Sequence, residues 1–275
     1  MGDALELWHR VPWLWDHVVA ASSCPTPCAG CSARRLGLMS SSDYQPLHLD
    51  WPGLANARDL GGLPVDGGVI REGALIRTES LTRLTEPDRL RDAGVSLIVD
   101  LRRPNESPEP HPFADDDIYV NLPVEDPADQ KDVDSTMGAL YLEMLDARPD
   151  LFATALGSMA EADPGAVLVH CAAGKDRTGL VVALALRVAG ADREVVAADY
   201  AATGDRLAPY VEAYLATIED EQQREFWRAH QATPVEFMLD VLDHLDVEHG
   251  GVEAYLRAGG MTDEQLSALR ERLVP

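Results

Sequence analysis

The chain has 275 residues, of which 46% are hydrophobic and 25% are charged, a composition typical of a folded globular protein with a substantial core. Asp and Glu outnumber Lys and Arg by 47 to 23, so the formal net charge is -24. This acidity argues against broad electrostatic binding to nucleic acid or to an anionic membrane, and an anionic substrate therefore needs a local binding site. No apolar run reaches the roughly 18 residues that a membrane-spanning helix requires.

Residues 1–45 differ in composition from the rest of the chain. They contain an apolar, tryptophan-rich stretch followed by three of the four cysteines. Charged residues interrupt the apolar stretch, so no export signal is predicted and the cytoplasm is the expected location, with secretion by a route that needs no signal peptide as the alternative. Four cysteines are also too few for a disulfide scaffold in a chain of this length. We expect an N-terminal extension that is disordered or not native, with Met39 as an alternative translation start.

The spacing of Cys24, Cys28 and Cys31 resembles that of an iron–sulfur site, and His17 or His48 would complete a set of zinc ligands. A radical enzyme of the iron–sulfur kind is a barrel of its own, and the sequence predicts no such domain. Chance or a misassigned start explains the three cysteines better. We therefore predict neither a metal nor any other cofactor.

From residue 56 onward, strand-like and helix-like stretches alternate. The pattern predicts a hairpin over 67–79, a helix over 85–93 capped by Thr85, strands over 95–101, 118–122 and 166–169, and helices over 134–147 and 150–162. After Gly174 it predicts helices over 177–189, 192–202, 206–217, 219–230, 234–247, 250–258 and 262–273. This order predicts an α/β fold with a central, mostly parallel sheet flanked by helices, which we assign to one domain over residues 46–275.

The most informative stretch is HCAAGKDRTG, residues 170–179, which lies between the last predicted strand and a helix. A cysteine followed after five residues by an arginine, at a strand-to-helix turn, is the pattern of a loop that binds phosphate and carries a nucleophile. Backbone N–H groups in such a loop surround an anion, and the helix N-terminus adds partial positive charge. The same field favours the thiolate of Cys171, which makes it nucleophilic.

Other positions of this loop suit the same chemistry. The guanidinium of Arg177 would hold two phosphate oxygens and stabilise the charge of the transition state. The hydroxyl of Thr178 would donate to the sulfur of Cys171 when that sulfur leaves. We call residues 171–178 the nucleophile loop, and its candidate phosphate-binding residues are Cys171, Ala172, Ala173, Gly174, Lys175, Asp176, Arg177 and Thr178.

These residues resemble the signature loop of cysteine-dependent protein-tyrosine and dual-specificity phosphatases, in the HCxxGKDRTG variant of the bacterial branch that is like protein tyrosine phosphatase B. The resemblance extends to three further stretches and so spans about residues 46–275: NARDLGG at 56–62, IVDLR at 98–102 and VEAYLR at 252–257. It implies a tyrosine-phosphatase-like fold whose C-terminal helices form a lid over the site; the alternative is a plain helical outer layer, and helix periodicity does not distinguish the two.

The resemblance also implies the chemistry and the substrates. Cys171 would be the nucleophile of a metal-free, two-step hydrolysis, and Arg177 would bind the phosphate. The substrates would be phosphotyrosine proteins, with phosphoserine or phosphothreonine proteins and phosphoinositides as further classes. Lys175 stands where phosphoinositide-active members carry a lysine, and the chain has only one other lysine, Lys131.

A general acid is needed to protonate the leaving group, and we favour Asp176 and Asp100 among the candidates. Asp176 lies next to the arginine of the loop, and Asp100 ends a predicted strand. Asp126 is a third candidate. An aspartate at a strand end with Arg102 beyond it fits a structural ion pair equally well. The NARD sequence at 56–59 is expected to brace the loop rather than to react.

Two alternatives to a protein phosphatase remain open at this stage. One is a pseudophosphatase that binds a phosphorylated partner without turnover, although no residue of the loop is missing. The other is a phosphatase of inositol phosphates or phosphoinositides, which would keep the loop and need a more basic pocket. Sulfur transfer of the rhodanese type is disfavoured by the five-residue gap and the Arg-Thr-Gly sequence. The sequence predicts no particular oligomeric state.

Overall fold

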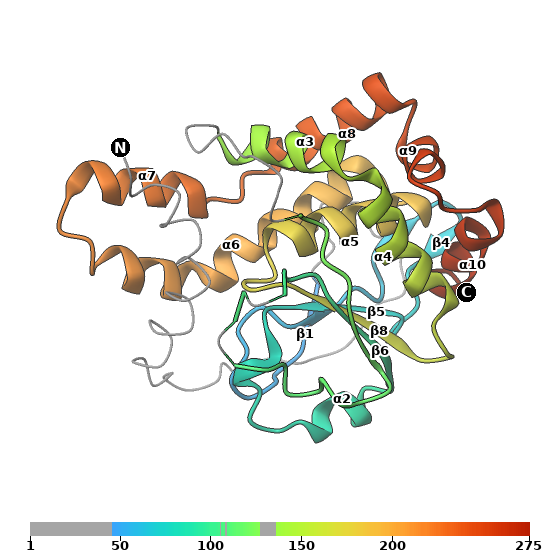
Figure 1. The fold of residues 1–275 in the computed structure, drawn as a ribbon, viewed down its shortest axis with the longest axis horizontal. Coiled ribbons are helices and arrows are strands. Elements are labelled where there is room, and N and C mark those ends of the chain that lie inside the picture. The colour runs from blue at the N-terminus through green and yellow to red at the C-terminus, as the bar shows by residue number, and fades with distance from the viewer. Residues whose placement is uncertain (1–45, 105, 108, 127–135) are drawn as a thin grey trace.

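The computed structural model describes residues 46–104, 106–107, 109–126 and 136–275 (Figure 1). The N-terminal extension, with Met39, His17 and the cysteines at 24, 28 and 31, lies outside the described residues, as does Lys131.

The core of the molecule is a six-stranded sheet with the order β1-β2-β5-β8-β6-β7. Its strands are β1 (Leu47–His48), β2 (Arg58–Asp59), β5 (Leu75–Thr78), β8 (Ala166–His170), β6 (Val95–Asp100) and β7 (Tyr119–Asn121). The pairs β5–β8, β8–β6 and β6–β7 are parallel, whereas β1 and β2 are antiparallel to their neighbours. The predicted mostly parallel sheet is therefore confirmed, with the strand that leads to the nucleophile loop at its centre.

Both faces of the sheet are covered, which explains why its central strands are continuous apolar runs. On one face, Val167 and Val169 pack in a core with α3 (Met137–Ala147), α4 (Pro149–Glu161), α5 (Asp176–Val188), α9 (Val252–Ala258) and α10 (Asp263–Leu273). On the other face, Leu168 and Ile98 pack against residues 51–57 and the short helices η2 (Leu81–Arg83) and α2 (Asp88–Asp92). Figure 1 shows α2 on the opposite side of the sheet from α3, α4 and α5.

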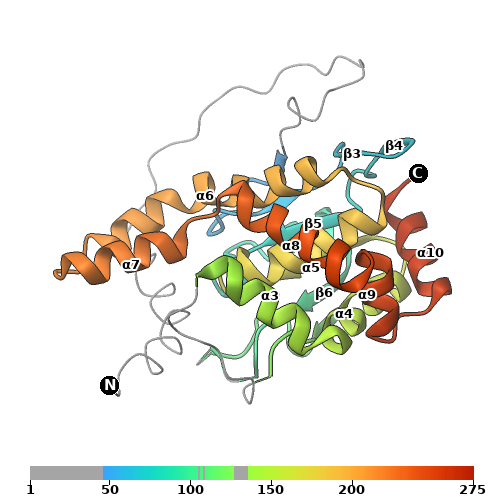
Figure 2. The ribbon, with the colours of Figure 1, turned by 90° about the horizontal axis from the view of Figure 1, so that it is seen from above.

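Two helices form an arm that projects from the sheet, and a third helix packs against the base of this arm. The helices α6 (Arg193–Leu215) and α7 (Glu221–Gln231) make a hairpin that projects from the sheet, and α8 (Val235–His249) returns to pack on α6 and α3 (Figures 1 and 2). The predicted break between residues 202 and 206 is wrong, because α6 is one helix of 23 residues. Its buried face runs through Tyr200, Thr203 and Leu207, so burial continues across the expected break.

Two other sequence predictions need correction. The predicted hairpin over 67–79 is shorter and begins earlier: β3 (Pro64–Val65) pairs with β4 (Gly68–Val69), while residues 75–78 form β5 between β2 and β8. The helix predicted over 85–93 is only Asp88–Asp92, and its N-cap is Pro87. Thr85 does not cap it, since both its backbone N–H and its hydroxyl donate to the carbonyl of Pro52.

Within the ranges that the structure describes, no helix is both long enough and apolar enough to cross a lipid bilayer.

Candidate active site

The nucleophile loop connects the C-terminal end of β8 to α5. Cys171 is buried, with 2% of its surface exposed, and α5 begins at Asp176. Gly174 has a φ of +66°, and a Cβ there would lie 2.3 Å from the carbonyl oxygen of Thr78. The backbone N–H of Ser80 donates to the carbonyl of Ala172 (2.9 Å). The end of β5 therefore presses directly against the loop, and only a glycine fits at that contact.

The NARD sequence is hydrogen-bonded to the nucleophile loop. The amide nitrogen of Asn56 donates to the carbonyls of Ala173 (3.1 Å) and Gly174 (3.2 Å). Arg58 in turn donates to the Asn56 amide oxygen (2.5 Å), and the Glu79 carboxylate accepts the backbone N–H of Asn56 (2.9 Å). These contacts match the expected bracing role, because they fix two carbonyls of the loop away from any bound anion.

A buried ion cluster supports this brace. The carboxylate of Asp199, on α6, accepts from Arg58 Nε (2.9 Å) and from Arg77 Nη1 (2.6 Å), and the three side chains are at most 1% exposed. Arg77 also donates to the carbonyl of Gly174 (2.8 Å). Burial opposes ionisation of a carboxyl, but the two arginines hold the pKa of Asp199 below its ordinary value. The loop is thus tied through Arg77 to a charged centre in the protein interior.

Asp59, the last residue of NARD, shapes the turn that follows. Its carboxylate accepts the backbone N–H groups of Gly61 (2.9 Å) and Gly73 (2.8 Å). Gly62 has a φ of +83°, and a Cβ on Gly61 would lie 2.5 Å from the Cα of Glu72. The two glycines are therefore explained by a left-handed backbone at one and a close approach at the other.

Two glutamates hold the guanidinium of Arg177. Both Nη atoms donate to the Glu106 carboxylate, at 2.5 and 2.6 Å, and Nε lies 3.6 Å from an oxygen of Glu125. A guanidinium has five N–H donors in a fixed plane, so these carboxylates orient it and leave donors for a phosphate. Sequence analysis missed both glutamates. The one available signal for Glu106 is its position four residues beyond the DLR sequence.

The Arg177–Glu106 ion pair is expected to make part of the protein's stability depend on pH. Burial by itself would raise the pKa of Glu106, but the charge and hydrogen bonds of Arg177 lower it from an ordinary value of 4.5 to about 2. Because the folded pKa lies below the unfolded one, this stabilisation is complete above about pH 4.5 and is lost as the pH falls toward 2. The difference between the folded and unfolded pKa values corresponds to roughly 3 kcal/mol of stabilisation.

We expect Glu106→Gln to flatten the acid limb of the curve of unfolding free energy against pH, measured by urea denaturation between pH 6 and pH 3. The exposed Glu109→Gln variant is the matched control and should keep the wild-type slope. Parallel curves for wild type and Glu106→Gln would show that the pair contributes nothing to the pH dependence.

Asp100 lies at the end of β6 in a tight ion pair. Its two oxygens accept from Arg102 Nη2 (2.8 Å) and Nε (3.0 Å), from the Arg102 backbone N–H (3.0 Å) and from the Tyr119 hydroxyl (3.1 Å). Burial opposes its ionisation, yet the hydrogen bonds and the charge of Arg102 hold the pKa of Asp100 well below its ordinary value. A carboxylate that is ionised and fully bonded has no proton to give, so the structure favours the ion-pair alternative for Asp100.

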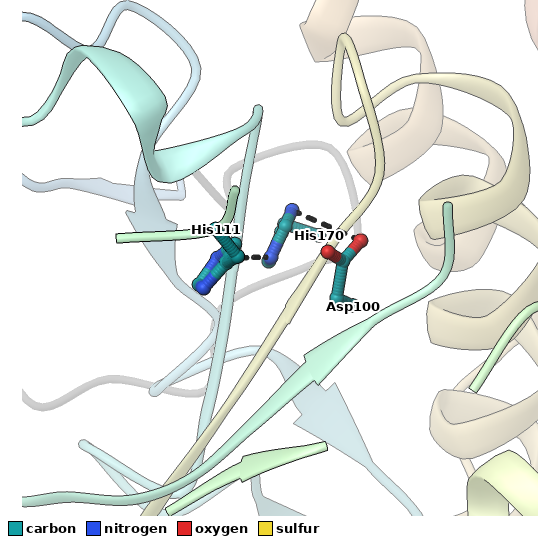
Figure 3. Close-up of side chains that lie close together, drawn as sticks. All are labelled: Asp100, His111 and His170. Atoms are coloured by element: carbon teal, nitrogen blue, oxygen red, sulfur yellow. Dashed lines mark hydrogen bonds and ion pairs between the residues drawn. The ribbon is translucent and has the colours of Figure 1, made fainter. Parts of the chain in front are cut away.

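His170 lies between His111 and Asp100, and its ring stacks on that of His111 (Figure 3). His111 Nδ1 accepts the backbone N–H of Phe113 (3.2 Å), so its Nε2 carries the proton and donates to His170 Nε2 (3.1 Å). His170 Nδ1 then donates to the carbonyl of Cys171 (3.0 Å). Burial lowers the pKa of both rings, that of His111 to about 3, which agrees with neutral rings. The network fixes the backbone of the nucleophile, and sequence analysis missed His111.

Asp176 occupies the rim of the loop, with 29% of its side chain exposed. The hydroxyl of Tyr141, on α3, donates to Asp176 Oδ1 and lies 2.8 Å from the hydroxyl of Tyr200. Burial, and after it the charge of Asp176, raises the pKa of Tyr141 well above its ordinary value, so this phenol stays protonated and remains a donor. Tyr141 therefore orients the carboxyl of Asp176, another contact that sequence analysis missed.

The remaining predicted residues have distinct environments. Lys175 is buried, and its ammonium donates to the carbonyl of His230 near the end of α7 (2.6 Å), so the helical arm touches the loop. Among the described residues, the buried hydroxyl of Thr178 has no hydrogen-bond partner. Asp126 accepts a hydrogen bond from Arg148, the N-cap residue of α4 (2.9 Å).

Comparison with known proteins decides the family. A model of the tyrosine phosphatase family matches residues 49–275. The chain belongs to this family. It is 32% identical over 224 residues to a tyrosine-protein phosphatase of Nostoc commune, which covers 73% of this chain and 74% of that protein. It is 28% identical over 271 residues to the triple specificity protein phosphatase PtpB of Mycobacterium tuberculosis, with 80% of this chain and 96% of that protein covered.

The protein is therefore a protein-tyrosine phosphatase, and its substrates are phosphorylated molecules. The family and the fold predicted from the HCAAGKDRTG stretch and its companion sequences are confirmed.

Proposed function

We propose that this phosphatase hydrolyses phosphotyrosine in proteins through a covalent phosphate ester on Cys171. The observation that carries the proposal is the arrangement on one strand-to-helix turn: Cys171 begins the loop, and Arg177 in the first turn of α5 is oriented by the Glu106 carboxylate. Phosphate oxygens would bind the backbone N–H groups of the loop and the N–H groups of Arg177 that the glutamates leave. In that position phosphorus would lie next to the sulfur of Cys171.

The reaction consists of two displacements. In the first, the Cys171 thiolate forms a bond to phosphorus as the bond to the tyrosine oxygen breaks, and Asp176 gives its proton to that oxygen. In the second, Asp176 takes a proton from water, the water oxygen bonds to phosphorus, and the sulfur leaves as a thiolate. Thr178 would donate its hydroxyl to the leaving sulfur, which gives its buried hydroxyl a role. No metal takes part in either step of this proposal.

Asp176 is the proposed general acid because it is partly exposed at the rim of the loop and is oriented by Tyr141. We expect Asp176→Asn to lower kcat/KM on phosphotyrosine on the order of 10²–10³-fold, since kcat/KM reports formation of the ester and proton transfer to the leaving phenolate is then lost. The loss should be much smaller for an aryl phosphate whose phenol is strongly acidic, because that phenolate leaves without taking up a proton.

Asp100→Asn is the matched comparison for this measurement. It removes the partner of Arg102, so any loss should be equal across the series of leaving groups. An equal loss for Asp176→Asn across the same series would contradict its role as the general acid.

Phosphoinositides are a second proposed substrate class, favoured by the one lysine in the loop. Lys175 lies beside Asp176 (3.4 Å) and would add positive charge next to a phosphate if it left the His230 carbonyl. The class is tested by comparing kcat/KM at equal concentrations of phosphotyrosine peptides, phosphoserine peptides and phosphoinositide vesicles, in buffer with a metal chelator. We expect the phosphotyrosine peptides to rank first.

Two results would overturn the proposal. A higher kcat/KM for the vesicles would make the enzyme a lipid phosphatase. An absence of turnover on every substrate, with phosphopeptide binding retained, would make it a phosphate-binding pseudophosphatase.

A further inference from the structure

A second cluster of metal-ligating side chains lies outside the active site, where α3 packs against α8. Asp146 is on the last turn of α3, and His244 and His249 are on the second half of α8. The Nε2 atoms of the two rings lie 2.8 and 2.9 Å from the same oxygen of Asp146. The two helices lie side by side in both views (Figures 1 and 2). Three residues from two helices thus converge on one point of the surface.

The spacing of these atoms suits a transition-metal ion. One ligand atom from each residue lies within 4.8 Å of the other two. Ligands about 2.1 Å from one tetrahedral zinc ion lie roughly 3.4 Å apart, so small side-chain movements would bring all three into contact with a common ion. Two imidazoles and one carboxylate are a ligand set for zinc and related divalent ions, with water in the fourth position.

The surroundings of the cluster favour a cation. Helix α8 has no lysine or arginine, and besides its two histidines it carries five acidic residues: Glu236, Asp240, Asp243, Asp246 and Glu248. Asp146 is half exposed and the two rings are 17% and 25% exposed, so an ion can reach them without unfolding. The buried group of Asp100, His111 and His170 has similar distances, but Arg102 already occupies both oxygens of that aspartate.

We propose that Asp146, His244 and His249 bind one Zn²⁺ ion that ties α3 to α8. Each imidazole would bind in its neutral form through Nε2, with its proton on Nδ1, and the Asp146 oxygen that now accepts both hydrogen bonds would bind the ion directly. Both helices are linked to neighbouring residues of the nucleophile loop, Asp176 and Lys175. Tyr141 on α3 contacts Asp176, and α8 directly follows the arm whose His230 carbonyl binds Lys175. The ion would therefore stiffen the frame of the active site without touching substrate.

The test uses the full chain with all four cysteines replaced by serine, because thiolates also bind zinc. A calorimetric titration with ZnCl₂ in phosphate-free buffer should show that one zinc ion binds per chain, with a Kd in the micromolar range or lower. Zinc should also raise the Tm by several degrees, since an ion that binds only the folded state stabilises it. The four-serine variant lacks Cys171, so the result does not depend on the proposed reaction.

Variants assign the site. Asp146→Asn and His244→Ala should each weaken the binding at least about tenfold and remove the shift in Tm. Glu248→Gln removes one exposed charge from the same helix and should leave the affinity unchanged. Asp146→Asn keeps the size of a half-exposed side chain, so it decides the question even if His244→Ala does not fold. No saturable binding, or an affinity that both Asp146→Asn and His244→Ala leave unchanged, would overturn the proposal.

Discussion

Replacing Cys171 with serine is expected to abolish hydrolysis, with a fall in kcat on the order of 10⁴-fold or more, while the protein keeps its fold and its affinity for phosphate. A serine hydroxyl is far less acidic than a thiol, and the loop offers it no general base in hydrogen-bond contact. The other anion-binding parts of the loop are unchanged, because the brace from Asn56 and Arg77 contacts the carbonyls of Ala173 and Gly174. Hydrolysis of p-nitrophenyl phosphate with a chelator present measures the loss.

Two controls separate this result from damage to the fold. The Cys24→Ser variant removes a cysteine outside the loop and should keep the wild-type kcat. The Tm of Cys171→Ser and its Kd for inorganic phosphate should both stay close to wild type. Wild-type turnover in Cys171→Ser would exclude a covalent mechanism at this residue.

The largest effect on stability is expected from Asp199→Asn. The variant leaves Arg58 and Arg77 buried with no negative partner between them, and loss of one member of a buried ion cluster costs about 3–5 kcal/mol. The loss appears as a lower free energy of unfolding in urea at pH 7. Activity should fall as well, since Arg77 holds the carbonyl of Gly174 in the nucleophile loop.

Asp205→Asn is the matched control, because Asp205 is an exposed aspartate on the same helix. Its unfolding free energy should stay within about 0.5 kcal/mol of wild type, as for most surface substitutions. An equally small change for Asp199→Asn would mean that the buried charges do not support the loop.

The parts of this molecule that were predictable are those that short stretches determine. The apolar run at 166–169 predicted a buried strand, and the spacing of Cys171, Gly174 and Arg177 after it predicted a loop that binds an anion. The parallel sheet followed from such runs alternating with helices. The bracing role of NARD was also predicted, because Gly61 and Gly62, which follow it, indicated a constrained turn.

The residues that were missed act across long separations in sequence. Glu106 and Arg177 are 71 residues apart, and Tyr141 and Asp176 are 35 apart. A glutamate in a loop and a tyrosine on a helix carry no local sign of such a partner. The same limit explains Asp100: its sequence position fits an acid or an ion pair, and only the contacts of Arg102 and Tyr119 distinguish them.

The break predicted in α6 failed for a similar reason. Thr203 and Gly204 are poor helix formers, and Pro209 follows in the same helix. Their tertiary contacts outweigh this preference, since Thr203 accepts a hydrogen bond from Arg58 (2.9 Å). Gly204 leaves room for Thr233, whose hydroxyl oxygen would lie 2.5 Å from an added Cβ.

The central claim is that phosphate passes through Cys171, and trapping the intermediate tests it most directly. Wild type and Asp176→Asn are mixed with a phosphotyrosine peptide carrying radioactive phosphorus, quenched within milliseconds in denaturant, and digested for peptide mapping. We predict a labelled peptide that contains Cys171, with more label in Asp176→Asn if the lost base slows hydrolysis of the ester more than the lost acid slows its formation. Label on another residue, or rapid turnover without any labelled peptide at the earliest times, would contradict the mechanism.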